Sequence, residues 1–226
     1  MKNDVLFQRF FGDASQEYSE ILKQGRVKLS ESCYVDTQNM YFMEQIHSDN
    51  VVIIDDVDRT GSNVMPQCDG LVTSLKNTFV ATKTADCFPV LLYDEEKEVV
   101  AVAHSGREGT RLKIVGKIIK IMVDRFLSKP ENIKVEIGVG ICPNHYPVSP
   151  EIVEDFREAF MTDDITESLD LQKLIIDTAI ENNILRENIF PSSLCSFEDK
   201  GYFSFRRGEN ADRQISFIGM VYGRDI

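Results

Sequence analysis

Short apolar runs separated by polar turns recur along the chain, and their length and composition favour β-strands. The runs are rich in β-branched residues, and turn residues such as Asp69-Gly70 bound them, as is typical of strands. We expect strands at Val51–Asp55, Gly70–Ser74, Phe79–Thr84, Val90–Tyr93, Val99–His104, Val135–Gly140, Tyr202–Phe205 and Gln214–Met220.

Three other segments place apolar residues at steps of three and four, which is the period of an amphipathic helix. They cover Thr110–Leu127, Pro150–Met161 and Leu169–Asn183, with Thr110 as a capping residue and Pro150 in a first turn. Strands come first, helices follow and strands return, without strict alternation. This order predicts an α+β, mixed-sheet layered fold in a single domain that spans residues 1–226.

Composition and charge narrow the functional classes. The 226 residues, 42% of them hydrophobic, can form a substantial core. A net charge of −12 would repel DNA and RNA, so we expect no nucleic-acid partner. No apolar run is long enough to span a membrane, and the N-terminal segment lacks the pattern of a secretory signal. We therefore expect a cytoplasmic protein without a membrane partner.

The five cysteines are widely spread and form no C-x-x-C pair. In the cytosol, this spacing favours free thiols, a metal ligand or a nucleophile over a disulfide framework. Cys33, Cys68 and Cys195 lie in no motif that indicates a partner.

His104 ends the apolar run VVAVAH and is followed by a glycine-containing turn and a predicted helix. This arrangement can expose a functional side chain, and the first amides of a helix suit an anion, with Arg107 and Arg111 adding positive charge. The simpler interpretation is that His104 only closes the strand with a local hydrogen bond.

Cys87 and His47 are the other candidates for chemistry. Cys87 lies between two predicted strands, where Pro89 makes the chain irregular and Asp86 could orient a ligand. His47 precedes a strand within Glu44–Asn50. Taken alone, Cys87 would be an ordinary buried thiol and His47 a histidine of a surface loop.

Two mechanisms fit these side chains. Three ligands of the types His, Cys and His would suit zinc or copper with an open fourth position. Alternatively, Cys87 and His104 could form a thiolate–imidazole pair. Near the C-terminus, Arg206 and Arg207 follow an aromatic run, and guanidinium groups bind phosphate or carboxylate with two hydrogen bonds. Local sequence does not choose between the two mechanisms.

Several longer motifs follow one another in a fixed order: Gln45-Ile46-His47, Asp69–Thr73, Ala85–Leu92, Ala103-His104-Ser105-Gly106 with Gly109-Thr110, Gly138–Ile141 with Tyr146 and Val148, and Phe203–Arg207. In this order they resemble the YfiH-like family, which is also described as the laccase-domain or multicopper polyphenol oxidase family. The resemblance covers most of the chain from about residue 35 onward, and the pair A-D-C-x-P-V-L-L and A-H-x-G is quite specific.

The resemblance implies a layered α/β sandwich with mixed β-sheets and a zinc site formed by His47, Cys87 and His104. Family members are described as cleaving adenosine, inosine or guanosine with phosphate, deaminating adenosine and handling methylthioadenosine. Older descriptions make them copper-dependent polyphenol oxidases. A cysteine hydrolase that removes a wrong amino-acid linkage from a cell-wall precursor is a further proposed role.

Two stretches depart from the family pattern. The family usually has A-H-A-G-W-R-G-T, whereas Arg107 and Glu108 replace its Trp and Arg here. A glutamate would repel phosphate. The family also often has Cys-Cys before Tyr146, where Asn144 and His145 stand here, with Cys142 nearby. His145 is then either an added group near the pocket or a surface replacement.

The leading expectation is a zinc-dependent purine nucleoside phosphorylase with adenosine deaminase activity, acting on a purine nucleoside and phosphate. Besides the three metal ligands, Asp86 or Glu108 would move protons, and Arg107, Thr110, Arg206 and Arg207 would hold phosphate. The alternatives are a cysteine hydrolase with Cys87 as nucleophile, a copper oxidase, for which a total of three histidines is too few, and a binding protein without turnover. Whether the protein is a monomer or a homodimer stays open.

Overall fold

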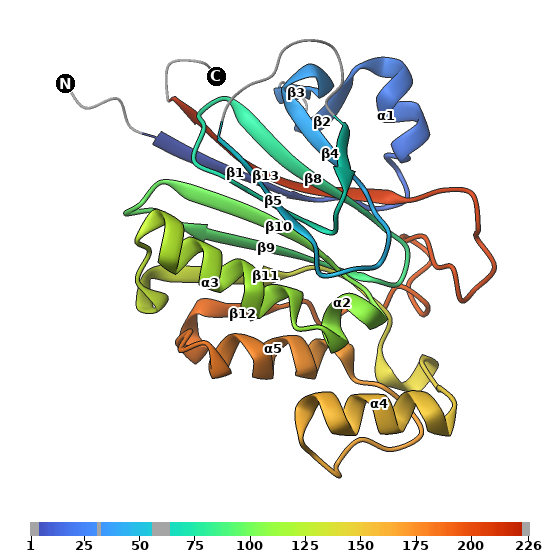
Figure 1. The fold of residues 1–226 in the computed structure, drawn as a ribbon. Coiled ribbons are helices and arrows are strands. Elements are labelled where there is room, and N and C mark those ends of the chain that lie inside the picture. Colours follow the sequence, from blue (N-terminus) through green and yellow to red (C-terminus); the bar gives the residue numbers. More distant parts are fainter. Residues whose placement is uncertain (1–4, 31–32, 56–63, 223–226) are drawn as a thin grey trace.

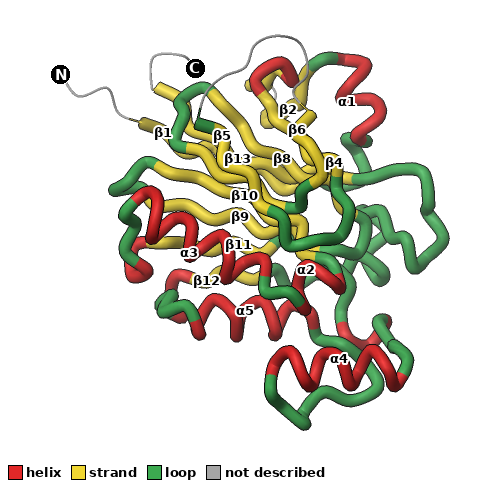
Figure 2. Tube along the Cα trace, viewed as in Figure 1, coloured by secondary structure: helices red, strands yellow, loops and turns green. Residues whose placement is uncertain are grey.

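Two β-sheets pack face to face and carry helices on their outer sides (Figure 1). The computed structural model describes residues 5–30, 33–55 and 64–222. Strands fill the middle of the molecule, and the helices lie around them (Figure 2). The predicted α+β class with mixed sheets is confirmed.

The first sheet has five strands in the order β1-β13-β8-β4-β6. Its members are β1 (Val5–Phe11), β13 (Gln214–Tyr222), β8 (Thr78–Thr84), β4 (Met40–Glu44) and β6 (Val64–Gln67). The β1, β13 and β8 pairings are antiparallel, whereas β4 pairs in parallel with both β8 and β6. The sheet is therefore mixed.

The second sheet has six strands in the order β12-β11-β9-β10-β7-β5. Its members are β12 (Ile189–Pro191), β11 (Ile133–Ile137), β9 (Phe88–Asp94), β10 (Val99–Ser105), β7 (Gly70–Thr73) and β5 (Val51–Ile54). Only the two edge strands, β12 and β5, pair in parallel with their neighbours. A separate antiparallel pair is formed by β2 (Arg26–Ser30) and β3 (Cys33–Asp36).

Helices lie on the outer sides of this sandwich, two of them along the six-stranded sheet and one short helix at the five-stranded sheet (Figure 1). The helices α3 (Ile114–Phe126) and α5 (Leu171–Glu181) lie on the six-stranded sheet, and α1 (Tyr18–Gln24) lies near the β2–β3 pair (Figure 1). The helix α4 (Pro150–Phe160) stands at one end of the molecule. In the part of the chain that the structure describes, no helix combines the length and apolarity that a membrane crossing requires.

The burial of β10 explains why its sequence is almost entirely apolar. Side chains alternate between the two faces of a strand. Val100 and Val102 belong to the core between the two sheets, whereas Val99, Ala101 and Ala103 belong to the core under α3 and α5. Because both faces are covered, no position before His104 can be polar without loss of stability.

Seven of the eight predicted strands are present, with ends that shift by a few residues. The strand predicted at Tyr202–Phe205 is wrong, because this segment forms turns around the guanidinium group of Arg207, which donates to the Tyr202 carbonyl. The elements β1, α1, β2, β3, β4, β6 and β12 were not predicted.

The predicted helix Thr110–Leu127 is in fact two helices, α2 (Arg107–Arg111) and α3. Lys113 has a left-handed backbone with φ 55°, which ends the regular helical path between them. Thr110 lies inside α2 rather than at its cap, and Gly106 takes the N-cap position. The predictions of α4 and α5 are confirmed, with α5 starting slightly later than expected.

Candidate metal centre

His47, Cys87 and His104 come together at one edge of the sandwich. His47 follows β4, Cys87 lies in the turn by which the chain passes from β8 to β9, and His104 is near the end of β10. Their ligand atoms all lie within 4.8 Å of one another. The Cys87 Sγ–His47 Nε2 distance is 4.0 Å, and the two imidazole centroids are 4.8 Å apart. The three residues expected from the sequence to act together are thus neighbours in space.

Asp69 lies behind this cluster and is fully buried. Its carboxylate is 2.8 Å from His104 Nδ1 and accepts backbone N–H groups of His47 and Ser48. The carboxylate therefore fixes the imidazole of His104 and the backbone that carries His47, which is the usual arrangement behind a metal-bound histidine. In the sequence, Asp69 stands out only as a turn residue and as the first residue of the motif Asp69–Thr73, and neither feature indicates a role in the site. Its contact with His104 follows from the pairing of β7, which starts directly after Asp69, with β10.

Backbone constraints also shape the cluster. His47 and Asp86 have left-handed backbones with φ 57° and 82°, which is uncommon for residues other than glycine. At Gly106, an added Cβ would lie 2.7 Å from the Cys87 sulfur and 3.3 Å from the His47 ring. Glycine is thus required at position 106 so that Cys87 and His47 can approach each other.

The protein groups around the cluster favour uncharged Cys87 and His104. Burial, followed by the nearby Asp86, raises the pKa of the Cys87 thiol to about 12. Burial also lowers the pKa of His104, although its hydrogen bond with Asp69 acts in the opposite direction. Both shifts disfavour a thiolate–imidazolium pair made from protein groups alone, and a thiolate at Cys87 would need a cation beside it.

The surroundings of Asp69 favour the charged form of its carboxylate, whereas those of Cys87 and His104 favour their uncharged forms. Burial alone would raise its pKa, but the hydrogen bonds from His104 and Ser48 outweigh burial and lower the pKa to about 2. Asp69 is therefore an anion at neutral pH and keeps the proton of His104 on Nδ1. The Nε2 atom of His104 then carries a free lone pair, which is what a metal ligand needs.

Asp86 is more constrained than the sequence suggested. One carboxylate oxygen accepts a hydrogen bond of 2.7 Å from the Ser196 hydroxyl, and the other accepts one of 2.7 Å from the backbone N–H of Arg206. Its side chain is buried and connects the Cys87 turn to two C-terminal loops. This geometry suits a positioning residue, and a role in proton transfer stays a prediction.

Residues of α2 bring both charge signs to the edge of the cluster. Arg107 is exposed and lies near enough to Cys87 to lower its pKa, although burial dominates. Glu108 is held by Arg111 at 2.9 Å, so its charge is largely compensated. The hydroxyl of Thr110 is buried and lies 2.9 Å from that of Ser105. Because α2 has only five residues, its dipole is weak.

The neighbouring arginines of the C-terminal loop have different surroundings. Arg206 is exposed and places its guanidinium group 5.0 Å from the centroid of the Tyr146 ring. Arg207 points into the loop, where it donates to the carbonyl oxygens of Ser196 and Phe197 and pairs with Glu209. Arg206 therefore has a guanidinium group accessible to an anion, whereas the donors of Arg207 are already used.

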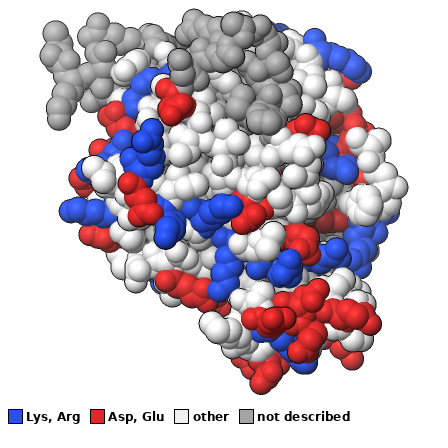
Figure 3. Space-filling model, in the orientation of Figure 1, with Lys and Arg blue, Asp and Glu red and all other residues white. Residues whose placement is uncertain are grey.

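The negative charge of the protein is unevenly distributed. Acidic side chains gather over α4, at the end of the molecule that this helix occupies (Figure 3). Around the cluster, by contrast, Arg107, Arg206 and Arg213 influence the pKa values of Cys87 or Tyr146. A small anion can therefore find local positive charge despite a net charge of −12.

Several known proteins are similar to this chain in sequence or structure. A purine nucleoside phosphorylase from Campylobacter jejuni is 34% identical over 85% of this chain and 80% of its own length. An adenosine deaminase from an unknown prokaryotic organism is 30% identical over 85% and 79%. The crystal structure of a Bacillus licheniformis protein called YfiH is 29% identical and covers 82% of this chain and 75% of its own, with a TM-score of 0.75.

The family model described as multi-copper polyphenol oxidoreductase laccase matches residues 9–221. This match extends over nearly all of the chain and includes every residue of the cluster. The chain therefore belongs to the multi-copper polyphenol oxidoreductase laccase family.

Proposed function

We propose that this chain is a zinc-dependent purine nucleoside phosphorylase that also deaminates adenosine. The observation that carries the proposal is the convergence of His47, Cys87 and His104 beside the exposed Arg107 and Arg206. The names of the relatives supply the substrate class, because several similar bacterial proteins are called purine nucleoside phosphorylases.

The three side chains fit a metal ion. Two imidazoles and one thiolate form a donor set that suits zinc, and a site with three protein ligands keeps a fourth position for substrate or water. Asp69 fixes His104, and the missing Cβ of Gly106 leaves space at the sulfur. When bound, zinc supplies a Lewis acid that polarises a substrate oxygen or water. Copper fits the same donors, so the loaded metal must be measured.

In phosphorolysis, a phosphate oxygen forms a bond to C1′ of the ribose while the C1′–N9 bond breaks. The purine leaves with the electron pair and takes up a proton. Arg107 and Arg206 are the residues we assign to phosphate. Both are exposed, Arg107 is close enough to Cys87 to lower its pKa, and the backbone N–H of Arg206 donates to Asp86, the residue before Cys87. The pairing of Glu108 with Arg111 removes much of the repulsion that its sequence position suggested.

Deamination is a second candidate because one relative is named an adenosine deaminase. In this reaction, water adds to the purine carbon that carries the amine, and ammonia leaves with a proton. A proton carrier is needed, and Glu108 and Asp86 remain the candidates from this chain. Of these two, Glu108 is the less buried, whereas both oxygens of Asp86 already accept hydrogen bonds.

Two other functions fit less well. A cysteine hydrolase needs a nucleophilic thiolate at Cys87, and burial raises the pKa of that thiol to about 12. A multicopper oxidase needs many histidine ligands, but the whole chain contains three, and one of them, His145, lies in a separate group of side chains.

The test is an assay of the purified protein with adenosine, inosine and methylthioadenosine, each with and without phosphate, together with metal analysis. We expect phosphate-dependent release of free base that disappears in Cys87→Ala. Formation of inosine without phosphate dependence would identify a deaminase. If zinc is bound but no nucleoside is turned over, the proposal is wrong and a hydrolase becomes the leading candidate.

A further inference from the structure

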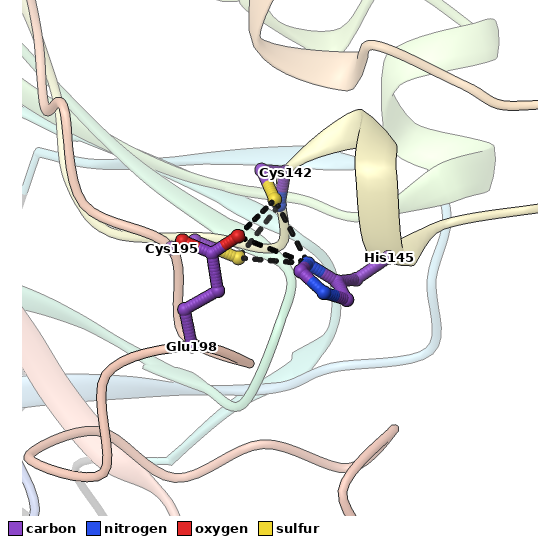
Figure 4. A group of neighbouring side chains, drawn as sticks. All are labelled: Cys142, His145, Cys195 and Glu198. Carbon is purple, nitrogen blue, oxygen red and sulfur yellow. Dashed lines mark hydrogen bonds and ion pairs between the residues drawn. The ribbon is translucent and has the colours of Figure 1, made fainter.

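A second group of metal-ligand side chains lies in two loops beyond the first cluster. Cys142 follows β11, and His145 ends the short helical turn Pro143–His145. Cys195 and Glu198 lie in the loop after β12. All four side chains point toward one another (Figure 4). Their ligand atoms lie within 4.8 Å of one another.

The distances in this group are close to those of a tetrahedral zinc site. The Cys142 sulfur is 3.2 Å from His145 Nδ1 and 3.8 Å from a Glu198 oxygen, and His145 Nδ1 is 3.4 Å from that oxygen. The Cys195 sulfur is 4.0 Å from His145 Nδ1. Bond lengths of about 2.3 Å to sulfur and about 2.0–2.1 Å to nitrogen and oxygen place tetrahedral ligands roughly 3.3–3.8 Å apart.

We propose that Cys142, His145, Cys195 and Glu198 form a second, structural zinc site. Four protein ligands complete a tetrahedron and leave no position for substrate, unlike the three ligands of the first cluster. Each cysteine gives up its thiol proton when the ion binds, so zinc uptake releases two protons to solvent.

The sequence spacing supports this assignment. The ligands form two short pairs, Cys142-x-x-His145 and Cys195-x-x-Glu198, and the distant pairs meet only in the fold. Structural zinc sites commonly use ligands in closely spaced pairs of this kind. The histidine stands at one of the positions where this chain departs from the family pattern, and it supplies a nitrogen ligand there.

Neighbouring groups orient the four ligands. The ring of His145 stacks on Phe197 with a centroid distance of 4.4 Å, which fixes its rotation. The backbone N–H of Cys142 donates to the Cys195 sulfur at 3.2 Å, an interaction that stabilises a thiolate. Gly140 and Cys195 also form a backbone bridge. The two loops are thus already held near the geometry that an ion requires.

The site has a structural consequence for the first cluster. Ser196, the residue after Cys195, donates to the Asp86 carboxylate at 2.7 Å, and Ile141, the residue before Cys142, donates its backbone N–H to the Asp86 carbonyl at 2.9 Å. Asp86 in turn precedes Cys87. A zinc ion that joins the two loops would therefore hold the turn that presents Cys87.

The first test is zinc content of the full-length protein after exposure to Zn²⁺ and removal of loosely bound ions. We expect two ions per chain in the native sequence, one in Cys87→Ser, one in Cys142→Ser and none in the double variant. The two single variants control for each other, because each one removes a ligand from one cluster and leaves the other cluster intact. A Cys87→Ser protein that binds no zinc would overturn the second site, whatever the activity of the native enzyme.

The second test covers the case in which Cys142→Ser does not fold. Co²⁺ added to the Cys87→Ser protein should give the intense visible and thiolate charge-transfer bands of a tetrahedral site with two sulfur ligands. Glu198 is exposed, so Glu198→Gln should keep the fold. In a chelator competition, this variant should bind Zn²⁺ at the second site at least about 10- to 100-fold more weakly, because even residues that only hydrogen-bond to a metal ligand have effects of this size. An unchanged affinity would exclude Glu198 as a ligand and contradict the site as proposed.

A disulfide between Cys142 and Cys195 is the competing arrangement. Peptide mass analysis of the unreduced protein, purified with and without a reductant, distinguishes this disulfide from the zinc site. Free thiols with one zinc ion retained in Cys87→Ser support the proposal, whereas a linked peptide pair that excludes zinc under both conditions overturns it.

Discussion

The two side-chain clusters share some ligand types but differ in how they are supported. In the first cluster, His104 lies on a fully covered strand, and the buried Asp69 fixes both histidines. In the second, all four residues lie in loops, and Glu198 is exposed. Three ligands with one open position suit chemistry on a substrate, and four protein ligands that join two loops suit a structural link.

Replacement of Cys87 by serine should have the largest effect. It removes the only sulfur ligand of the first cluster, and a catalytic metal contributes several kcal/mol to the reaction. We expect kcat/KM for nucleoside phosphorolysis to fall by about a thousandfold or more. Steady-state kinetics measure the effect, and the unfolding midpoint should stay close to that of the native protein. A Cys87→Ser variant with nearly full activity would show that the cluster is not the active site.

Gly106→Ala tests whether close approach is required within the first cluster. The added methyl group would lie 2.7 Å from the Cys87 sulfur, so the sulfur or the α2 turn must move. We expect Zn²⁺ affinity at the first cluster to fall by about 10- to 100-fold, as for other changes that disturb ligand orientation. Chelator competition measures it in a Cys142→Ser background.

The matched control for this change is Gly201→Ala. Its added Cβ would meet only the flexible Asp199 side chain at 3.0 Å, at an exposed position. We expect native zinc affinity in the control. Equal losses in the two variants would point to a general effect on folding instead of a local effect on Cys87.

The ligands were easier to predict from the sequence than the residues that support them. His47, Cys87 and His104 were expected to form a zinc site through the resemblance to the YfiH-like family, because each had a simpler interpretation when taken alone. Only His104 lies on a strand that the apolar pattern predicted. Asp69 resembles an ordinary turn residue, because nothing local shows that it will face His104 from the adjacent strand. Its role depends on the pairing of β7 with β10, which sequence spacing does not reveal.

The second cluster was missed for a related reason. Each half of it is only a pair of residues, and the halves are separated by the whole of α4 and α5. The helix break at Lys113 was also invisible, since the apolar period continues through it and only the left-handed backbone interrupts the helix. Long-range pairing and local backbone handedness thus set the limit of the sequence analysis.

Asp69→Asn tests the support of the first cluster. Because the folded pKa of Asp69 is about 2 and the unfolded value is about 3.9, its charge stabilises the fold at neutral pH by about 2–3 kcal/mol. That contribution is complete above the unfolded pKa and is lost as the pH falls toward 2. Denaturant unfolding measured from pH 7 to pH 2 gives the free energy of unfolding at each pH. At acid pH, this free energy should fall less in Asp69→Asn than in the native protein.

The same variant should also lower activity by about 10- to 100-fold, because the imidazole of His104 loses the anion that orients it. Glu167→Gln, which changes an exposed carboxyl group that belongs to neither cluster, serves as a control for removal of one negative charge. Identical pH profiles of Asp69→Asn and the native protein would show that Asp69 has no electrostatic role in stability.

The smallest effects should separate Arg206 and Arg207, two adjacent arginines of the C-terminal loop. Arg206→Ala removes an exposed guanidinium group, so we expect the KM for phosphate to rise by about tenfold, equivalent to about 1.4 kcal/mol, with little change in stability. Arg207→Ala removes donors to the carbonyls of Ser196 and Phe197, which flank the second cluster. It should lower stability by about 1–3 kcal/mol and leave the KM for phosphate nearly unchanged. If Arg207→Ala instead raises the phosphate KM while Arg206→Ala does not, the anion binds on the side of the second cluster, and the division between a chemical and a structural cluster fails.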